Sequence, residues 1–222
     1  MTAGTDDRTV QATGERFRQA CALLAEDAGV VVSPAMKAQM ACHAALVQEW
    51  NPRTKLVSRG DAALLFETHV VDALSLVPWL LQHGGAHAHL LDIGAGGGFP
   101  ALPLACVVPG LRCTLVERNL RKVGFLHRAI AAMELTGLEV VAGSYPECGG
   151  HVAADVVTAR AVERPATVAP AILKRLPRHG VFLCQTDISC VPDAELFHVE
   201  RVDDAWRAAG LRRGELYRVR PV

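Results

Sequence analysis

A cluster of glycines next to an acidic residue is the stretch of this sequence best suited to bind a ligand. Residues 90–100 read LLDIGAGGGFP, so Asp92 lies near the end of an apolar run and Gly94, Gly96 and Gly98 follow at alternate positions. Glycine lets the backbone turn sharply and approach a ligand closely. Free amide groups at the start of a following helix attract negatively charged groups. We therefore expect a ligand-binding turn between a buried strand and a helix.

A second acidic residue, Glu117, ends another apolar run about 20 residues beyond the turn, where nucleotide-binding folds carry a ribose-binding carboxylate. Dinucleotide folds need a third glycine where Phe99 stands here. The spacing of Gly94, Gly96 and Gly98 fits instead the turn of S-adenosylmethionine (SAM) methyltransferases, whose ligand has no pyrophosphate. The pattern favours SAM, and the alternative is a purely structural turn with a solvated acid.

Hydrophobic periodicity predicts the elements that would position these residues. After residue 85, runs of strand length alternate with helical stretches, which predicts a parallel sheet covered by helices on both faces. Two strands near the C-terminus are predicted to end the sheet in antiparallel orientation. The predicted fold class is therefore α/β, with a mostly parallel seven-stranded, Rossmann-like sheet. The predicted strands are His89–Ile93, Cys113–Glu117, Glu139–Ala142, Asp155–Thr158, Val181–Cys184, Phe197–Val202 and Glu215–Val219, and the predicted helices are Ala101–Val108, Leu120–Thr136 and Pro165–Leu176.

The first 85 residues are predicted to be helical, and we divide the chain into this N-terminal region (1–85), packed on the core, and a ligand-binding core (86–222). Apolar residues recur at helical spacing after a frayed start at residues 1–12. The predicted helices are Glu15–Ala28, one that starts at Ser33-Pro34 and ends at Asn51-Pro52, one capped by Asp61, and its continuation from Val70 to Leu81.

Composition restricts the class of protein without naming its substrate. The chain has 23 basic and 23 acidic residues, so no global field attracts nucleic acid and any such binding needs a local basic face. Its 7 cysteines include no Cys-x-x-Cys pair, which predicts reduced thiols and no metal site. A signal-peptide core and a bilayer-spanning apolar run are both missing from the sequence. We expect a cytoplasmic protein that does not contact a membrane.

Residues on both sides of the glycine turn resemble the RsmG (glucose-inhibited division protein B) family. Residues 91–100 with Leu102-Pro103-Leu104 resemble its signature, and further matches in the same order extend over residues 35–165: Trp50-Asn51, His69–Ala73, Arg121–Leu126 and Ala159–Ala161. This resemblance implies a class I SAM-dependent methyltransferase with an N-terminal helical extension. It further implies SAM as the cofactor, N7 of a guanine in 16S rRNA as the target and the 30S ribosomal subunit as the partner. We expect a monomer without a metal.

The resemblance also implies the site residues. Arg160 is the expected catalytic residue, holding the cofactor region or the target phosphate. The cofactor-binding residues implied are Asp92, Gly94, Gly96, Gly98, Phe99, Glu117, Ser144, Tyr145, Pro146 and Arg160. Phe99 and Tyr145 flank the ligand or simply pack. His69 and Asp72, one helical turn apart, either brace the helical region against the sheet or position the substrate.

The chain departs from the family pattern where RNA would be held. Ser144 and Gln185 stand near positions of family cations, and Lys55–Val57 replaces an Asn-Leu-Thr run. Phosphate contacts supply much of nucleic-acid affinity. Alternatives are therefore a diverged methyltransferase of another RNA base or a small molecule, or a SAM- or RNA-binding relative without catalysis. A nucleotide-dependent dehydrogenase is opposed by Phe99. Guanine N7 needs no general base, which agrees with a sequence that shows none beside the glycine turn.

Overall fold

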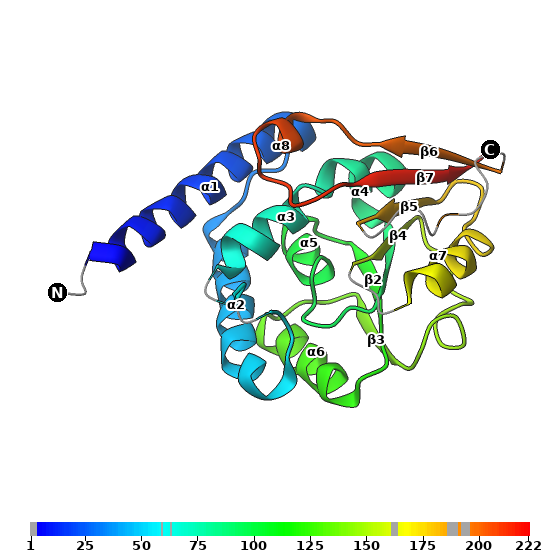
Figure 1. Ribbon diagram of the computed structural model, residues 1–222, viewed down its shortest axis with the longest axis horizontal. Coiled ribbons are helices and arrows are strands. Elements are labelled where there is room, and N and C mark those ends of the chain that lie inside the picture. Colours follow the sequence, from blue (N-terminus) through cyan, green and yellow to red (C-terminus); the bar gives the residue numbers. More distant parts are fainter. Residues whose placement is uncertain (1–3, 59, 63, 161–163, 186–190, 192–195) are drawn as a thin grey trace.

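The computed structural model describes residues 4–58, 60–62, 64–160, 164–185, 191 and 196–222, with the backbone alone for residues 4–13. Its centre is a seven-stranded sheet of order β3-β2-β1-β4-β5-β7-β6, which runs from β6 and β7 at the top of Figure 1 to β3 at the bottom. The strands are β1 (His89–Ile93), β2 (Arg112–Glu117), β3 (Leu138–Ala142), β4 (Val156–Ala159), β5 (Val181–Cys184), β6 (Phe197–Arg201) and β7 (Tyr217–Pro221).

Strand directions confirm the predicted sheet. Strands β1 to β5 pair in parallel, whereas β7 is antiparallel to both β5 and β6. The last strand starts at Tyr217, two residues later than predicted. The strand order reverses between β1 and β4, and ligands of such sheets bind in the crevice beyond the carboxyl ends at this point. The end of β1 therefore places the glycine turn at the expected ligand site.

Helices cover the two faces of the sheet unequally. Successive strand residues point to opposite faces, so Leu90 joins a large hydrophobic cluster with the N-terminal helices while Leu91 joins a smaller one with α7 (Pro165–Leu173). The large cluster also contains α5 (Ala101–Val107) and α6 (Leu120–Ala132).

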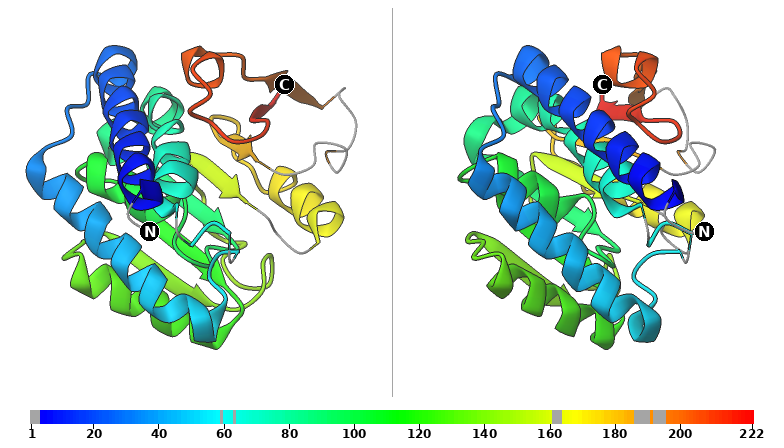
Figure 2. Two further views of the ribbon diagram at one scale, coloured as in Figure 1. Left: turned by 60° about the vertical axis from the view of Figure 1, so that its left-hand side comes forward. Right: turned by 90° about the vertical axis from the view of Figure 1, so that its left-hand side faces the viewer.

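The N-terminal helices form the outer layer over the large cluster. They are α1 (Gly4–Ala28), α2 (Pro34–Thr54), the π-helical turn η1 (Phe66–Val70), α3 (Val71–Leu74) and α4 (Val77–Gly84), followed by the 3-10 turn η2 (Gly85–His87). Seen from the side in Figure 2, α1 and α2 lie in front of the sheet, and α2 runs beside α6. Near the C-terminus, α8 (Ala205–Ala208) lies against α1, where the Trp206 indole donates to Asp27.

Four predictions about the helices of this layer were wrong. The first helix begins at Gly4 rather than after residue 12, because the stretch before Glu15 contains no proline that would end a helix. The second continues through Pro52 to Thr54, because Lys55 closes it in the left-handed conformation and donates to the Asn51 carbonyl.

The other two differences lie in the segment after Lys55. Asp61 does not cap a helix, because its carboxylate pairs with Arg213 and residues around it form a turn. The helix predicted over Val70–Leu81 is interrupted after Leu74, since Pro78 has no N–H to donate to the preceding turn.

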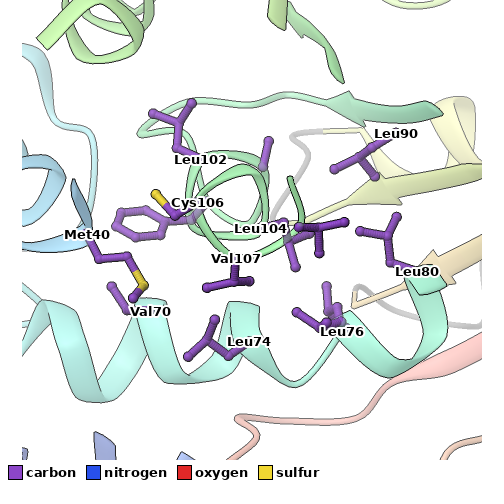
Figure 3. Close-up of a cluster of buried hydrophobic side chains, with 14 of the residues drawn as sticks. Met40, Val70, Leu74, Leu76, Leu80, Leu90, Leu102, Leu104, Cys106 and Val107 are labelled. Carbon is purple, nitrogen blue, oxygen red and sulfur yellow. The ribbon is translucent and has the colours of Figure 1, made fainter. Parts of the chain in front are cut away.

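Apolar side chains from the N-terminal helices, β1 and α5 meet in one cluster, shown in Figure 3. The labelled members, each at most 4% exposed, are Met40, Val70, Leu74, Leu76, Leu80, Leu90, Leu102, Leu104, Cys106 and Val107. Burying one such leucine contributes about 1.5–3 kcal/mol. Because α5 begins where the glycine turn ends, this packing also holds the turn. Among the described helices, none has the length and hydropathy needed to span a bilayer.

A buried ion pair fastens the C-terminal segment to α3. The fully buried Arg212 guanidinium donates to both oxygens of Asp204, at 2.8 and 2.6 Å. It also donates to the hydroxyl and the carbonyl of Ser75. Asp204 in turn caps α8 by accepting from the Arg207 amide. The connection between β6 and β7 is thereby tied to the N-terminal layer.

Replacing Asp204 with Ala should lower the free energy of unfolding by about 3 kcal/mol, because it leaves a buried guanidinium without its carboxylate. Urea unfolding of the purified protein measures the change. Asp203→Ala is the matched control, since the neighbouring Asp203 pairs with Arg201 and Arg207 at the surface and should cost about 0.5 kcal/mol or less. Equal losses in the two variants would contradict the assignment of Asp204 as a buried anchor.

Candidate cofactor and acceptor site

The glycine turn has a backbone that other residues adopt with difficulty. Gly94, Gly96 and Gly98 have φ values of 74°, 52° and 80°, in the left-handed region that favours glycine. A methyl group on Gly98 would also lie 2.5 Å from a Leu102 methyl carbon. The amides of Gly94 and Ala95 both donate to the Val116 carbonyl, which pins the turn to β2.

Glu117 ties the end of β2 to the same turn. One carboxylate oxygen accepts from the Gly96 amide at 3.0 Å and the other from the Asn119 amide at 2.8 Å. A carboxylate has about four acceptor positions, so two remain for a ribose diol. Glu117 lines a cavity of about 140 Å³, the smaller cavity, together with Gly94, Lys122, Ser144, Tyr145 and Arg164.

Asp92 lies beneath the turn and is almost fully buried. Its Oδ1 accepts from the Thr158 hydroxyl at 2.8 Å, and the Ala101 backbone amide also interacts with the carboxylate. Burial raises the pKa of Asp92 to about 7, opposed by the Thr158 hydrogen bond and the charge of Arg160. The protonated and ionised forms are therefore both accessible near neutral pH, and Asp92 can offer either a donor or an acceptor to the turn.

A cavity of about 700 Å³, the larger cavity, lies on the other side of the turn. Its wall includes Gly94, Gly96 and Phe99 from the turn. Residues far apart in the sequence complete it, including Lys55, Asp61, His69, Arg160, Gln185 and Arg213. Gly94 and Lys122 line both cavities. The two cavities therefore adjoin at these residues.

Two histidines support the aromatic residue of the turn. The His43 Nε2–H donates to the Gly97 carbonyl at 2.7 Å, and the His43 ring lies 4.5 Å from that of Phe99. The His69 ring lies 4.9 Å from Phe99. Burial lowers the pKa of each histidine to about 4, so both are neutral at pH 7. Phe99 is 7% exposed and is packed against both rings.

Asp72 joins three segments at the edge of the larger cavity. Its Oδ2 lies 3.2 Å from the Arg160 guanidinium and accepts from the Gln185 side chain, while its Oδ1 accepts from the Arg213 amide. The carboxylate is 1% exposed, and burial raises its pKa against the effect of Arg160. Of the pair His69 and Asp72, Asp72 therefore braces the helical region against the sheet, whereas His69 faces the cavity.

The residues named from the sequence divide between the two cavities. The smaller is lined by Gly94, Glu117, Ser144 and Tyr145, and the larger by Gly94, Gly96, Phe99 and Arg160. Asp92 is buried beneath the turn, and Gly98, within the turn, lies against Leu102. Pro146 follows Tyr145 and is not among the residues found to line either cavity. Ala161, part of the Ala159–Ala161 match, lies outside the described residues.

Sequence reasoning missed His43, Lys55, Asp61 and Arg213 as parts of the site. Arg213 contacts Asp61 across 152 residues, and no local pattern reports such a contact. The same folding supplies positive charge where the family cations are replaced. Lys122 and Arg164 line the smaller cavity with Ser144, and Lys55 and Arg213 line the larger one with Gln185.

His43 should make stability depend on pH. Its pKa is about 4 in the folded protein and about 6.5 when unfolded, so the unfolded chain binds the extra proton between these values. The contribution of a neutral His43 to the free energy of unfolding is therefore present above pH 6.5 and is lost as the pH falls toward 4.

The variant His43→Gln removes this titration and keeps a side-chain N–H for Gly97. The stability difference between wild type and variant, from urea unfolding at several pH values, should shrink as the pH is lowered from 6.5 to 4. His127→Gln, at an exposed position of α6, is the control for replacing a histidine with glutamine elsewhere on the chain. A constant difference for His43→Gln would contradict the buried, neutral state of His43.

Solved structures with similar folds include methyltransferases and related proteins. MtNAS in complex with MTA and tNA superposes with a TM-score of 0.56 at 16% identity, covering 84% of this chain and 71% of that one. A precorrin-6y C5,15-methyltransferase from Geobacter metallireducens GS-15 superposes with a TM-score of 0.50 at 16% identity, covering 74% and 88%. These likenesses show the fold, and they confirm the predicted Rossmann-like class.

Sequence comparison is more specific. The family model described as rRNA small subunit methyltransferase G matches residues 36–186. Ribosomal RNA small subunit methyltransferase G of Sorangium cellulosum (strain So ce56) is 38% identical over 161 residues, 70% of this chain and 66% of that protein. Its namesake in Marinobacter nauticus is 35% identical over 117 residues, 53% and 52%. The matches span about half to two thirds of these relatives' length. This chain belongs to the rRNA small subunit methyltransferase G (GidB) family.

Proposed function

We propose that this protein transfers a methyl group from SAM to N7 of a guanine in 16S rRNA of the 30S subunit. The observation that carries the proposal is the pair of adjoining cavities that share Gly94, one lined by the Glu117 carboxylate and the other by several cations. Family membership supports the reaction and the RNA. The smaller cavity suits the cofactor, and the adjoining larger cavity suits an acceptor.

The residues of the smaller cavity fit SAM. Glu117 keeps acceptor positions for the ribose hydroxyls after its two backbone hydrogen bonds. Gly94 brings bare backbone to the ligand, and Ser144 and Tyr145 line the same cavity. Asp92 supports the turn from its buried position beneath it. We assign cofactor binding to residues 86–222 and support of this site to the N-terminal region 1–85.

SAM, when bound, would supply a methyl group on a sulfonium sulfur. An acceptor lone pair would bond to the methyl carbon while the sulfur keeps the electrons of the broken S–C bond and leaves as a thioether. Guanine N7 has such a lone pair and no proton, so the chain needs no base. Its residues instead position the acceptor and exclude water. Phe99, packed on His43 and His69, closes one wall of the larger cavity.

Arg160 is the residue we propose to touch the reacting partners. Asp72 holds its guanidinium at 3.2 Å, and the side chain is 19% exposed at the cavity wall. In this position a guanidinium can hold a phosphate of the target nucleotide. Lys55, Lys122 and Arg213 add positive charge around the same cavity, which suits RNA entering from solvent. We propose that the protein acts as a cytoplasmic monomer.

A methyltransferase of another RNA base or of a small molecule is the second candidate. Ser144 and Gln185, in place of family cations, are the observation that favours it. The other cations of the two cavities weaken this argument, because they restore positive charge at both positions.

The test of the proposed function is transfer of tritiated methyl from SAM to 30S subunits that lack the modification. We expect incorporation of about one methyl group per subunit, in 7-methylguanosine after digestion of the RNA. Fully modified 30S subunits are the control and should accept none. Binding of SAM without incorporation into unmodified subunits would overturn the rRNA assignment.

Replacing Glu117 with Gln should weaken SAM binding by about tenfold or more, because hydrogen bonds to a charged acceptor contribute about 1.5–3 kcal/mol each. Isothermal titration calorimetry measures the affinity, and thermal unfolding without ligand detects any loosening of the turn. Glu139→Gln, at an exposed site on β3, is the matched control and should bind as wild type does. Unchanged affinity in Glu117→Gln would remove Glu117 from the ribose role.

A further inference from the structure

Asp61 and His69 form a polar pair on the wall of the larger cavity. The His69 Nε2 lies 3.5 Å from the Asp61 Oδ2, longer than an ordinary hydrogen bond. The His69 side chain is 10% exposed, and neither ring nitrogen has a hydrogen-bond partner within the described part of the chain. Buried polar atoms of native proteins are nearly always satisfied. The pair is therefore prepared for a polar ligand that enters this cavity.

Local structure fixes the direction of both side chains. His69 lies in the π-helical turn η1, a rare form that is frequent at functional sites. The turn before it is closed by hydrogen bonds from the Asp61 amide to the Ser58 hydroxyl and from the Leu64 amide to the Asp61 carbonyl. The Arg213 guanidinium donates to the Asp61 Oδ1 at 3.0 Å. This leaves the Oδ2 on the side of His69.

The chemistry of the pair matches one edge of guanine. An ionised carboxylate only accepts hydrogen bonds, whereas a neutral histidine ring carries one donor and one acceptor. His69 is neutral at pH 7, because burial and the charge of Arg160 lower its pKa to about 4. Guanine presents two donors, N1–H and N2–H, next to an acceptor, O6. Adenine has an acceptor at N1 and no donor at C2, so a carboxylate there would repel it.

We propose that Asp61 and His69 recognise the acceptor base, with Asp61 accepting from N1–H and N2–H of guanine and His69 donating to O6. This inference rests on the proposed function and deepens it by naming the residues that select the base. It also concerns the reaction, since a bond from N7 to a methyl group places positive charge on the purine. A carboxylate against N1–H stabilises that charge.

Asp61→Asn is the first test, because it keeps the shape of the side chain and replaces one accepting carboxylate oxygen with a donating amide group. We expect kcat/KM for methyl transfer to unmodified 30S subunits to fall by about 100-fold, from two charge-assisted hydrogen bonds. The affinity for S-adenosylhomocysteine should stay within about twofold of wild type. Asp203→Asn, at an exposed surface position, is the control and should retain full activity.

A binding experiment separates base recognition from a structural role. Saturation-transfer NMR on protein saturated with S-adenosylhomocysteine compares GMP, IMP and AMP, of which IMP lacks the N2 amine and AMP also lacks O6 and N1–H. Wild type should prefer GMP over IMP and IMP over AMP. Asp61→Asn should lose the preference for GMP over IMP. His69→Phe should lose much of the binding affinity that O6 contributes.

Three results would overturn the inference. The first is equal or undetectable binding of the three nucleotides to wild type. The second is an intact GMP preference in Asp61→Asn. The third is a large loss of S-adenosylhomocysteine affinity in that variant, which would assign Asp61 to the cofactor. Failure of the proposed function is distinguishable, because 30S subunits would then accept no methyl group even where the GMP preference depends on Asp61.

Discussion

A carboxylate removed from water must be matched by cations or N–H donors, and the arrangement of this site depends on how Asp72 meets that demand. The Arg160 guanidinium, the Gln185 amide and the Arg213 backbone N–H converge on it from three segments. Asp72 itself belongs to α3, in the N-terminal layer. The helical region, the ends of β4 and β5 and the C-terminal segment are therefore brought together by one buried charge, and the larger cavity is the space that they enclose.

The glycine turn is held from two sides in a comparable way. Val116 and Glu117 accept the turn's amides from the direction of β2, and His43 donates to the Gly97 carbonyl from α2. The turn contributes to both cavities, so its shape decides how the proposed cofactor and acceptor sites adjoin. The N-terminal helices thus help to form the site, because they carry His43, His69, Asp72 and the loop with Asp61.

Much of this arrangement was predictable from local sequence. The spacing of Gly94, Gly96 and Gly98, the acid at Glu117 and the alternation of strands and helices each follow from short-range rules, and the structure confirms the predicted sheet. Helix ends were less predictable, since Pro52 is tolerated inside α2 while Pro78 interrupts the helix before α4. The contacts of His43 with Gly97 and of Asp61 with Arg213 join residues 54 and 152 positions apart. Only the folded chain reveals them.

Two neighbouring arginines near the C-terminus have very different surroundings. Arg212 is locked between Asp204 and Ser75, while Arg213 reaches Asp61 and offers its amide to Asp72. Since one peptide bond joins them, a local opening that frees Arg212 also displaces Arg213 from the wall of the larger cavity. The stability of the C-terminal segment and the geometry of the larger cavity are therefore linked. Substitutions in β6 and β7 that loosen this segment would therefore alter the larger cavity through the bond between Arg212 and Arg213.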